Sequence, residues 1–338
     1  VHVASFGEEP IEYCDKHFNI QFARSPLKLQ NYKAYKELKK IIQENNYEII
    51  HCHTPVGGVL TRIAAKSERK KGTRVIYTAH GFHFYKGAPL KNWLFFYPVE
   101  WFLAKYTDTL ITINHEDFER AQKNFGKRCK DIQYVPGVGI DTKKFDLKMS
   151  EDEKIKLRES LNIKKDDFVL ICVARLDKNK NQGFLIKCMQ KLVKEHDNIH
   201  LLLVGRDELD GYYQKLTKKL NLENNIHFLG NRNDVPQLLK ISDGVVSASR
   251  REGLPVNIIE AINMGIPVIV LECRGMKDLI DEQVNGFIIN DENQMVYIIF
   301  ELYKRKFNIN KMKKNNLKKS KLYDVSYIIH IMKKIYLL

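Results

Sequence analysis

The alternation of short apolar runs with amphipathic helical segments restricts the fold of this chain more than any other feature. The runs contain few polar residues, as strands do in a parallel sheet that helices cover on both faces. This pattern predicts two doubly wound α/β domains, in which ligands bind at the carboxyl ends of the strands. The expected strands are 47–53, 74–79, 109–113, 132–135, 168–175, 200–204, 226–229, 245–248, 267–271 and 286–289.

The strand–helix rhythm breaks at residues 136–141, which read Pro-Gly-Val-Gly-Ile-Asp, and a highly charged stretch follows at 143–165. We therefore expect one domain over 1–145 and a second over 146–320. Residues 321–338 are expected to form an amphipathic helix that packs back toward the first domain. Its apolar stripe consists of Val325, Ile328, Ile329, Met332 and Ile335. The chain begins inside an expected strand, without an initiator methionine, so we expect an N-terminal unit to be missing.

The charge balance favours an anionic partner. The 56 lysines and arginines outnumber the 41 acidic residues, which gives a net charge of +15. A phosphorylated substrate, an acidic membrane or a nucleic acid would each suit this excess. No nucleic-acid recognition motif is visible, so we expect no nucleic-acid partner. The six cysteines are scattered, which indicates reduced thiols in a cytoplasmic protein.

Residues 82–106 are unusually aromatic. They hold both tryptophans of the chain, Trp93 and Trp101, with several lysines interleaved. Aromatic rings mixed with lysines suit a membrane–water interface, because both apolar and polar groups are satisfied there. An aromatic helix packed on its own domain would explain the same pattern. A platform for nucleic-acid bases would not, because the apolar run 93–98 is too continuous for an exposed surface.

The segment 244–263 joins a buried strand to a helix through a glycine turn. The helix is expected to start after Pro255 and to end at Gly265. The first amides of such a helix carry about half a positive charge and bind phosphate well. Two carboxylates, Glu252 and Glu260, flank this helix end and could accept hydrogen bonds from sugar hydroxyls. The segment could therefore bind a diphosphate with a sugar at each end, although a simple buried strand–helix junction would have the same pattern.

Cations follow two other strands of the second domain. Arg175 and Lys180 lie in the loop after the strand 168–175, where they could neutralise a pyrophosphate facing the helix end. A solvated charged loop is the alternative. The turn after the strand 226–229 contains Arg232, which could flank a base or phosphate, and Asp234, which could instead cap the next helix.

Histidines mark the strand ends of the first domain. His80 follows one strand end beside a glycine, where it could contact a sugar hydroxyl or a phosphate, or simply bond its neighbours. His51 and His53 share one face of a strand, but a zinc site needs a further ligand and none is evident nearby. The chain also lacks the Asp-x-Asp pattern that would hold a divalent ion on a diphosphate. We therefore expect no metal and no cofactor.

Together these motifs resemble glycosyltransferase family 4, whose members are retaining, nucleotide-sugar-dependent enzymes. Its GT-B fold consists of two Rossmann-like domains facing across a cleft. The resemblance rests on 137–141, Arg175 with Lys180, 204–205, 228–230, and the Glu252-Gly253-Leu254-Pro255 run with Glu260. The runs 51–55 and 78–83 further resemble the branch that builds capsular, exopolysaccharide and lipid-linked glycans. The family's first strand and its glycine-containing loop are not present in this sequence.

The resemblance implies roles for individual residues. Glu260 would bind the ribose hydroxyls and Glu252 the hydroxyls of the transferred sugar. The leaving diphosphate would be bound by Arg175, Lys180 and the backbone amides of the turn, and His80 would reach the donor sugar from the first domain. The catalytic set would be His80, Glu252, Arg175 and Lys180, and the donor-binding set Arg175, Lys180, Arg232, Glu252, Gly253, Leu254, Pro255, Val256, Asn257 and Glu260.

The implied reaction is transfer of a hexose or N-acetylhexosamine from a nucleoside diphosphate to a glycan or polyprenyl-diphosphate-linked acceptor. The branch resembled favours UDP, with guanine left open, and implies cell-surface polysaccharide synthesis. The basic surface and the aromatic segment 82–106 lead us to expect the enzyme on the anionic inner face of the plasma membrane, near a lipid-linked acceptor. A UDP-sugar 2-epimerase of the same architecture is one alternative. A truncated chain that binds nucleotide without turnover is another.

Overall fold

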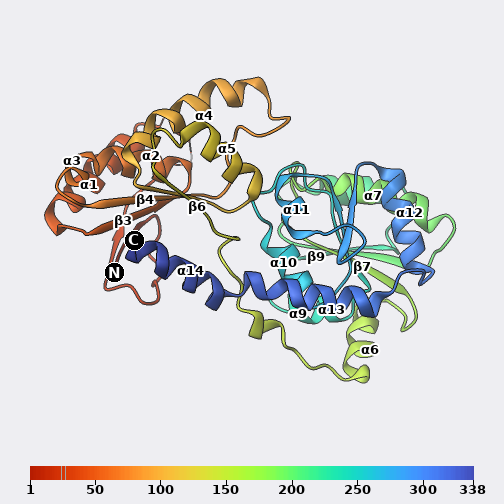
Figure 1. Cartoon of the computed structure of the whole chain (residues 1–338). Coiled ribbons are helices and arrows are strands. Elements are labelled where there is room, and N and C mark those ends of the chain that lie inside the picture. The colour runs from red at the N-terminus through yellow and green to blue at the C-terminus, as the bar shows by residue number, and fades with distance from the viewer. Residues whose placement is uncertain (24, 27) are drawn as a thin grey trace. The chain divides into compact units, whose positions relative to one another are not determined.

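The computed structural model describes residues 1–23, 25, 26 and 28–338, which form two compact units (Figure 1). The first unit comprises Val1–Val135 together with Lys334–Leu338, and the second comprises Pro136–Lys333. The sheets are parallel throughout, as the apolar runs predicted. The expected boundary at 145/146 lies inside the second unit.

The first unit contains a four-stranded sheet of order β3-β4-β5-β6 and a separate parallel pair, β1-β2. The pair includes one strand, β2, that the sequence pattern did not reveal. The elements of this unit are β1 (His2–Ser5), β2 (Lys16–Asn19), α1 (Gln30–Asn45), β3 (Ile49–His53), α2 (Pro55–Ala64), α3 (Lys66–Arg69), β4 (Arg74–Ala79), α4 (Leu90–Leu103), β5 (Thr109–Thr112), α5 (His115–Phe125) and β6 (Asp131–Tyr134).

Helix α2 starts at Pro55, directly after β3, and has two glycines, Gly57 and Gly58, in its first turn. The glycines disguised its start, because glycine is a poor helix former. The structure explains Gly58: a Cβ atom there would lie 2.5 Å from the ring of Tyr77 on β4. The helix therefore packs closer to the sheet than a side chain would allow.

A buried ion pair fixes the orientation of α4 against α2. The Arg62 guanidinium is 1% exposed, lies 2.9 Å from the Glu100 carboxylate on α4, and stacks 4.0 Å from the Tyr77 ring. Its Nε also donates to the Gly58 carbonyl at 2.9 Å. The Glu100 carboxylate also accepts from the Tyr77 hydroxyl at 3.3 Å, whereas Arg62 Nη2 has no hydrogen-bond partner among the described residues. The pair joins α2 to the inward face of α4.

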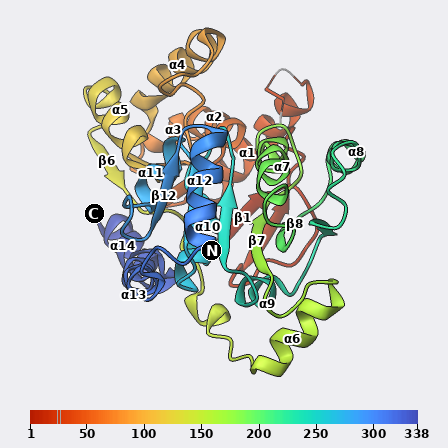
Figure 2. The ribbon, with the colours of Figure 1, turned by 90° about the vertical axis from the view of Figure 1, so that its right-hand side faces the viewer.

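The second unit contains a six-stranded sheet of order β12-β11-β10-β7-β8-β9, with β7 and β8 side by side (Figure 2). Its elements are α6 (Glu151–Ser160), β7 (Phe168–Val173), α7 (Gln182–Val193), β8 (Ile199–Val204), α8 (Tyr212–Lys219), β9 (Ile226–Gly230), α9 (Val235–Lys240), β10 (Gly244–Ser247), α10 (Val256–Asn263), β11 (Val268–Leu271), α11 (Arg274–Leu279), β12 (Gly286–Ile289), α12 (Glu292–Tyr303) and α13 (Ile309–Ser320). Helix α14 (Val325–Leu337) begins in this unit and ends in the first.

Helices cover both faces of this sheet. Helices α7 and α12 pack against each other on one face, and α10 packs on α13 on the other (Figure 1). Strands β7, β8 and β11 are almost entirely buried, which is why their apolar runs are so continuous. The strand order reverses between β7 and β10, because β8 and β9 extend to one side of β7 while β10, β11 and β12 extend to the other.

The charged stretch 143–165 contains helix α6, which the sequence reading treated only as a boundary region. Its start has a capping box: the Ser150 hydroxyl accepts from the Glu153 backbone amide, and the Glu153 carboxylate accepts from the Ser150 amide. Ser-x-x-Glu is a recognisable start signal. It was overlooked because α6 has no buried residue and therefore no apolar periodicity.

Candidate active site

Apart from Arg232, the predicted site residues of the second unit gather where the strand order reverses. The loop 174–181 follows β7, and the loop 248–255 follows the neighbouring strand β10. Loops on the two sides of such a reversal point diverge above the sheet and leave room for a ligand at the carboxyl ends of the strands. The topology therefore brings together two motifs that are about seventy residues apart in the sequence.

Hydrogen bonds hold the two loops to each other. The Arg250 amide donates to the Asn179 carbonyl at 2.8 Å, and the Asn179 side-chain amide donates back to the Arg251 carbonyl at 3.0 Å. The Asn181 side chain donates to the Ala248 carbonyl at 3.3 Å. These contacts fix the backbone of the loops before any ligand arrives, so ligand binding does not have to order them.

An ion pair joins the side chains of these loops. Lys180 Nζ donates to Glu252 Oε1 at 2.7 Å, and the two side chains are only 19% and 12% exposed. The ammonium group has three donors, and a carboxylate accepts several hydrogen bonds. Each partner can therefore bind a ligand group while the pair stays intact. The arrangement presents a cation and an anion side by side.

Arg175 is a more exposed cation in the same loop. Its side chain is 58% exposed, and its nearest ionic partner, Asp177, lies 3.6 Å away. Buried Gln182 donates to the Arg175 carbonyl at 2.8 Å, so the backbone is fixed while the guanidinium projects outward. An extended guanidinium suits bidentate binding of a phosphate.

Helix α10 begins beside the Lys180–Glu252 pair. Pro255 is its N-cap residue and supplies no side-chain hydrogen bond to the first amides. The Asn257 side chain in the first turn donates instead to the Val173 carbonyl at 2.8 Å, which ties the helix start to the end of β7. The helix end thus remains open to an anion. The sequence prediction of a helix after Pro255 is confirmed.

Glu260 lies on the same helix. Its carboxylate forms no hydrogen bond or ion pair with any described residue, and burial raises the pKa of this carboxyl above its ordinary value. A partly buried carboxylate without a partner is unfavourable unless a ligand satisfies it. The hydroxyl groups of a sugar are suitable donors.

The sequence reading missed two residues that support the turn before α10. Arg274 Nε on α11 donates to the Glu252 carbonyl at 3.2 Å. At Gly275, a Cβ atom would lie 2.2 Å from the Gly253 carbonyl oxygen. Both residues come directly after β11, so their position at the carboxyl end of a strand was the available signal.

Arg232 and Asp234 bond each other. Arg232 Nε lies 2.7 Å from Asp234 Oδ1, and the Asp234 side chain does not cap α9. The expectation that Asp234 caps the next helix is therefore wrong, because the bidentate pairing with Arg232 satisfies its carboxylate instead. Arg232 remains at the carboxyl end of β9.

His80 belongs to the first unit, where it lies beside the two histidines of β3. His53 Nδ1 is 3.1 Å from His80 Nε2, and the His51 and His53 rings are 4.2 Å apart. The sequence placed His51 and His53 on one face but did not show that His80 joins them. Within the described residues, no group of three or more histidine, cysteine or acidic side chains is arranged to hold a metal ion.

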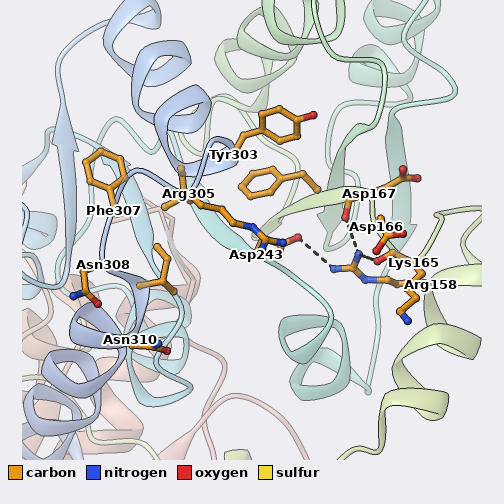
Figure 3. A pocket seen from close by; sticks show the side chains of 13 residues that line it. Arg158, Lys165, Asp166, Asp167, Asp243, Tyr303, Arg305, Phe307, Asn308 and Asn310 are labelled. Carbon is orange, nitrogen blue, oxygen red and sulfur yellow. Dashed lines mark hydrogen bonds and ion pairs between the residues drawn. The ribbon is translucent and has the colours of Figure 1, made fainter.

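A pocket of about 580 Å³ lies elsewhere in the second unit (Figure 3). It is lined by Phe168 and Asp243, which stand at the amino ends of β7 and β10. Arg158 crosses it and donates to the carbonyls of Asp167 and Ile241 at 2.7 and 2.6 Å. This pocket is at the opposite edge of the sheet from the candidate site and contains none of its residues.

Two sequence families match the chain. Residues 1–114 match the family described as Glycosyl transferase 4-like, and residues 153–318 match Glycosyl transferases group 1. The chain is 43% identical to the Bacillus subtilis (strain 168) protein named as glycosyltransferase EpsD, over 86% of this chain and 75% of that protein. It is 30% identical to an Escherichia coli UDP-Gal:alpha-D-GlcNAc-diphosphoundecaprenol alpha-1,3-galactosyltransferase, over 85% of this chain and 74% of that enzyme.

Solved structures share the fold. HepE of Anabaena in complex with UDP has a TM-score of 0.75 at 24% identity and covers 95% of this chain and 86% of its own. The sucrose-phosphate synthase of Thermosynechococcus elongatus has a TM-score of 0.78 at 18% identity, with 97% and 84% covered. The identity to two glycosyltransferases over most of their lengths therefore shows that this chain belongs to glycosyltransferase family 4 and has the GT-B fold.

Proposed function

We propose that this enzyme is a retaining glycosyltransferase that uses a UDP-linked hexose or N-acetylhexosamine. Its acceptor is a glycan or polyprenyl-diphosphate-linked sugar in cell-surface polysaccharide synthesis. The observation that carries the proposal is the Lys180–Glu252 pair beside the open end of α10. A nucleotide sugar combines a diphosphate with hydroxyl-rich rings, and this site offers cations next to carboxylates.

The proposed donor pose follows from the charges. Lys180, the exposed Arg175 guanidinium and the first amides of α10 bind the diphosphate, whose negative charge increases as the sugar leaves. Glu252 accepts hydrogen bonds from the transferred sugar, and the unpartnered Glu260 carboxylate accepts them from the ribose. His80, which belongs to the first unit, contacts the donor sugar. Fixed cations that meet developing charge lower the barrier without reorganising water.

Two relatives of the chain support a lipid-linked acceptor. The Escherichia coli relative is a galactosyltransferase whose acceptor is a sugar on diphosphoundecaprenol, and its donor is UDP-Gal. A Campylobacter jejuni relative, 28% identical over 69% of this chain, transfers N-acetylgalactosamine to a diphospho-undecaprenol-linked sugar. The same chemistry here gives a lipid-linked acceptor and a UDP-linked hexose or hexosamine.

Nucleotide binding tests the donor site. In calorimetric titrations with UDP, GDP and ADP, we expect UDP to bind selectively. Glu260→Ala should weaken UDP binding about tenfold or more, because charged hydrogen bonds contribute about 1.5–3 kcal/mol each. UDP affinity should also fall as the pH drops through the raised pKa of Glu260, since a protonated carboxyl cannot accept from both ribose hydroxyls.

The matched control is Glu223→Ala, which removes an exposed glutamate elsewhere in the unit. Unchanged UDP affinity in Glu260→Ala would contradict the assignment of the ribose site.

Product analysis then distinguishes a transferase from an epimerase. Transfer should require an acceptor and conserve the anomeric configuration of the donor sugar. Conversion of the nucleotide sugar without an acceptor would instead indicate the epimerase alternative.

The exposed face of α4 supports a membrane-bound acceptor. Leu94, Phe95, Val99 and Phe102 share one side of this helix and are 65%, 72%, 42% and 46% exposed. The opposite side packs Trp93 and Tyr97 on the buried core of the first unit. A helix that is apolar on both sides needs a second apolar environment.

Cations border this face. Lys105 Nζ lies 4.0 Å from the centre of the Phe102 ring, and the Arg128 guanidinium lies 3.2 Å from that of Trp101. Rings inserted among lipid headgroups with cations at their edges are typical of interfacial segments. No helix among the described residues is long and apolar enough to span a bilayer. The exposed apolar side of α4 and the cations at its border lead us to propose peripheral attachment to the inner face of the plasma membrane through this helix.

Vesicle sedimentation tests this attachment. The protein should bind vesicles that contain phosphatidylglycerol more tightly than neutral ones, and salt should weaken the binding. Replacing Leu94 and Phe95 together with serine should lower binding at least about tenfold, because two apolar side chains lose their burial in lipid. Tyr297→Ser, on α12, removes an aromatic of similar exposure and should change nothing. The proposal would be contradicted if the double variant bound vesicles as tightly as the wild type. It would also be contradicted if the two substitutions changed only the self-association of the protein.

A further inference from the structure

A row of polar side chains lies on one face of the first unit's sheet. Strands β3 and β4 pair in parallel with His51 opposite Ile76 and His53 opposite Thr78. Side chains alternate along a strand, so His51, His53 and Thr78 project from the same face. His80 follows β4 directly.

These side chains are linked to one another. His51 Nε2 lies 2.7 Å from Thr78 Oγ1, and the His51 ring packs 4.2 Å from the ring of His53. His53 Nδ1 in turn lies 3.1 Å from His80 Nε2. The chain of contacts therefore runs from the middle of β3 to the histidine proposed to reach the donor sugar.

The last turn of α14 completes this network. Tyr336 Oη lies 2.7 Å from His51 Nδ1, and Ile335 beside it is 3% exposed. Arg74 at the start of β4 donates to the carbonyls of Ile335 and Tyr336 at 2.7 and 3.3 Å. A cation bonded to the last carbonyls of a helix is favourable for both hydrogen bonding and the helix dipole. The position of the Tyr336 hydroxyl is thus well determined.

The network restricts the imidazole rings. Both ring nitrogens of His51 are bonded, so this ring cannot rotate without losing a hydrogen bond. One hydrogen lies between His53 Nδ1 and His80 Nε2. The ring that donates this hydrogen has its other nitrogen free to accept, and the ring that accepts it carries its own hydrogen on its other nitrogen. Loss of hydration, with repulsion from the neighbouring histidines, lowers the pKa of His51 to about 3 and that of His53 to about 4. Neutral rings at pH 7 allow His53 and His80 to bond each other while His51 packs on His53 without charge repulsion.

We propose that Tyr336 is a positioning residue of the transferase site: it holds His51, and thereby orients the His53 ring packed on His51 and the His80 ring bonded to His53. The inference rests on the proposed role of His80 at the donor sugar. Thr78, the other partner of His51, shares this function. The last turn of α14 thus acts on the reaction through the histidines, with no contact of its own to the substrate.

Tyr336→Phe tests the inference, because it removes the hydroxyl and keeps the ring. We expect kcat for transfer to fall about three- to tenfold, the effect of one hydrogen bond, with the KM for donor within about twofold. In ¹⁵N NMR, the imidazole tautomers should change, and the pKa values of His53 and His80 should shift by about half a unit or more. Tyr327→Phe on the same helix is the control, since the Tyr327 hydroxyl bonds no described residue and the residue as a whole is 42% exposed.

A second variant, Thr78→Val, removes the hydroxyl partner of His51 Nε2, and it should likewise change the imidazole NMR signals and shift the pKa values of His53 and His80. Unchanged tautomers and pKa values in both variants would overturn the inference. So would changed NMR signals with wild-type kcat. If the unmodified chain transfers no sugar from any donor, the proposed function fails, while the NMR titration still decides whether Tyr336 orients the histidines.

Discussion

Replacing Lys180 with methionine is expected to lower kcat for sugar transfer about a hundredfold or more while the protein stays folded. The ammonium group lies 2.7 Å from Glu252 and is largely shielded from solvent, so its charge acts at short range. Removing a fixed donor that meets developing negative charge typically has an effect of this size. The variant also leaves the Glu252 carboxylate without its cation next to the diphosphate, so donor affinity should fall as well. Steady-state kinetics with varied donor would measure both effects.

The matched control is Lys178→Met, which removes an exposed lysine from the same loop. Its kcat should remain within about twofold of wild type, because an exposed charge is screened by water. Turnover of Lys180→Met close to that of the control would rule out the proposed role of this residue at the leaving group. Circular dichroism would verify that both variants are folded.

Gly275→Ala is expected to weaken donor binding at least about tenfold, although the new methyl group does not touch the donor. A Cβ atom at this position would lie 2.2 Å from the Gly253 carbonyl oxygen and 3.2 Å from Leu254 Cα. Backbone atoms cannot rotate away as a side chain can, so the turn before α10 has to move. We also expect a loss of about 1–3 kcal/mol in the free energy of unfolding, as for other overpacked sites.

Gly244→Ala separates these two effects. At the amino end of β10, a Cβ atom there would lie 3.2 Å from the ends of two leucine side chains, Leu170 and Leu302, and at an ordinary contact distance of 3.8 Å from the Pro267 carbonyl oxygen. It should therefore lower stability without changing UDP affinity. Calorimetric titration and thermal unfolding of both variants would test this contrast. Wild-type UDP affinity in Gly275→Ala would show that the turn does not need its present geometry.

The strands were predictable from the sequence because a strand that is buried on both faces of a sheet consists of a continuous run of apolar residues. Strand β4 was expected at 74–79 and found at Arg74–Ala79, and β12 was expected at 286–289 and found at Gly286–Ile289. Elements without an apolar period were harder to recognise. Helix α6 is exposed. Helix α2 begins with two glycines, and the reason for one of them, Gly58, is close packing on Tyr77, which belongs to a strand elsewhere in the chain.

The aromatic stretch 82–106 is another segment whose environment could not be predicted from the sequence alone. Its composition predicted either a packed helix or an interfacial one, and α4 has both features because its two sides differ. Periodicity could not assign the sides, since the helix is apolar all round. The buried Arg62–Glu100 pair, between two helices, lies on the side that faces inward.

The sequence alone determined which loops could carry chemistry, since cations, carboxylates and glycines follow apolar strands at recognisable positions. Only the tertiary structure decided which of these residues meet. Lys180 bonds Glu252 because β7 and β10 are neighbours in the sheet, and strand order leaves no trace in local periodicity. Gly275 is required because the Gly253 carbonyl lies against it, and Tyr336 matters because its hydroxyl bonds His51. Both contacts join residues that are far apart in the sequence. Such contacts depend on how distant elements pack, which no local pattern of residues encodes.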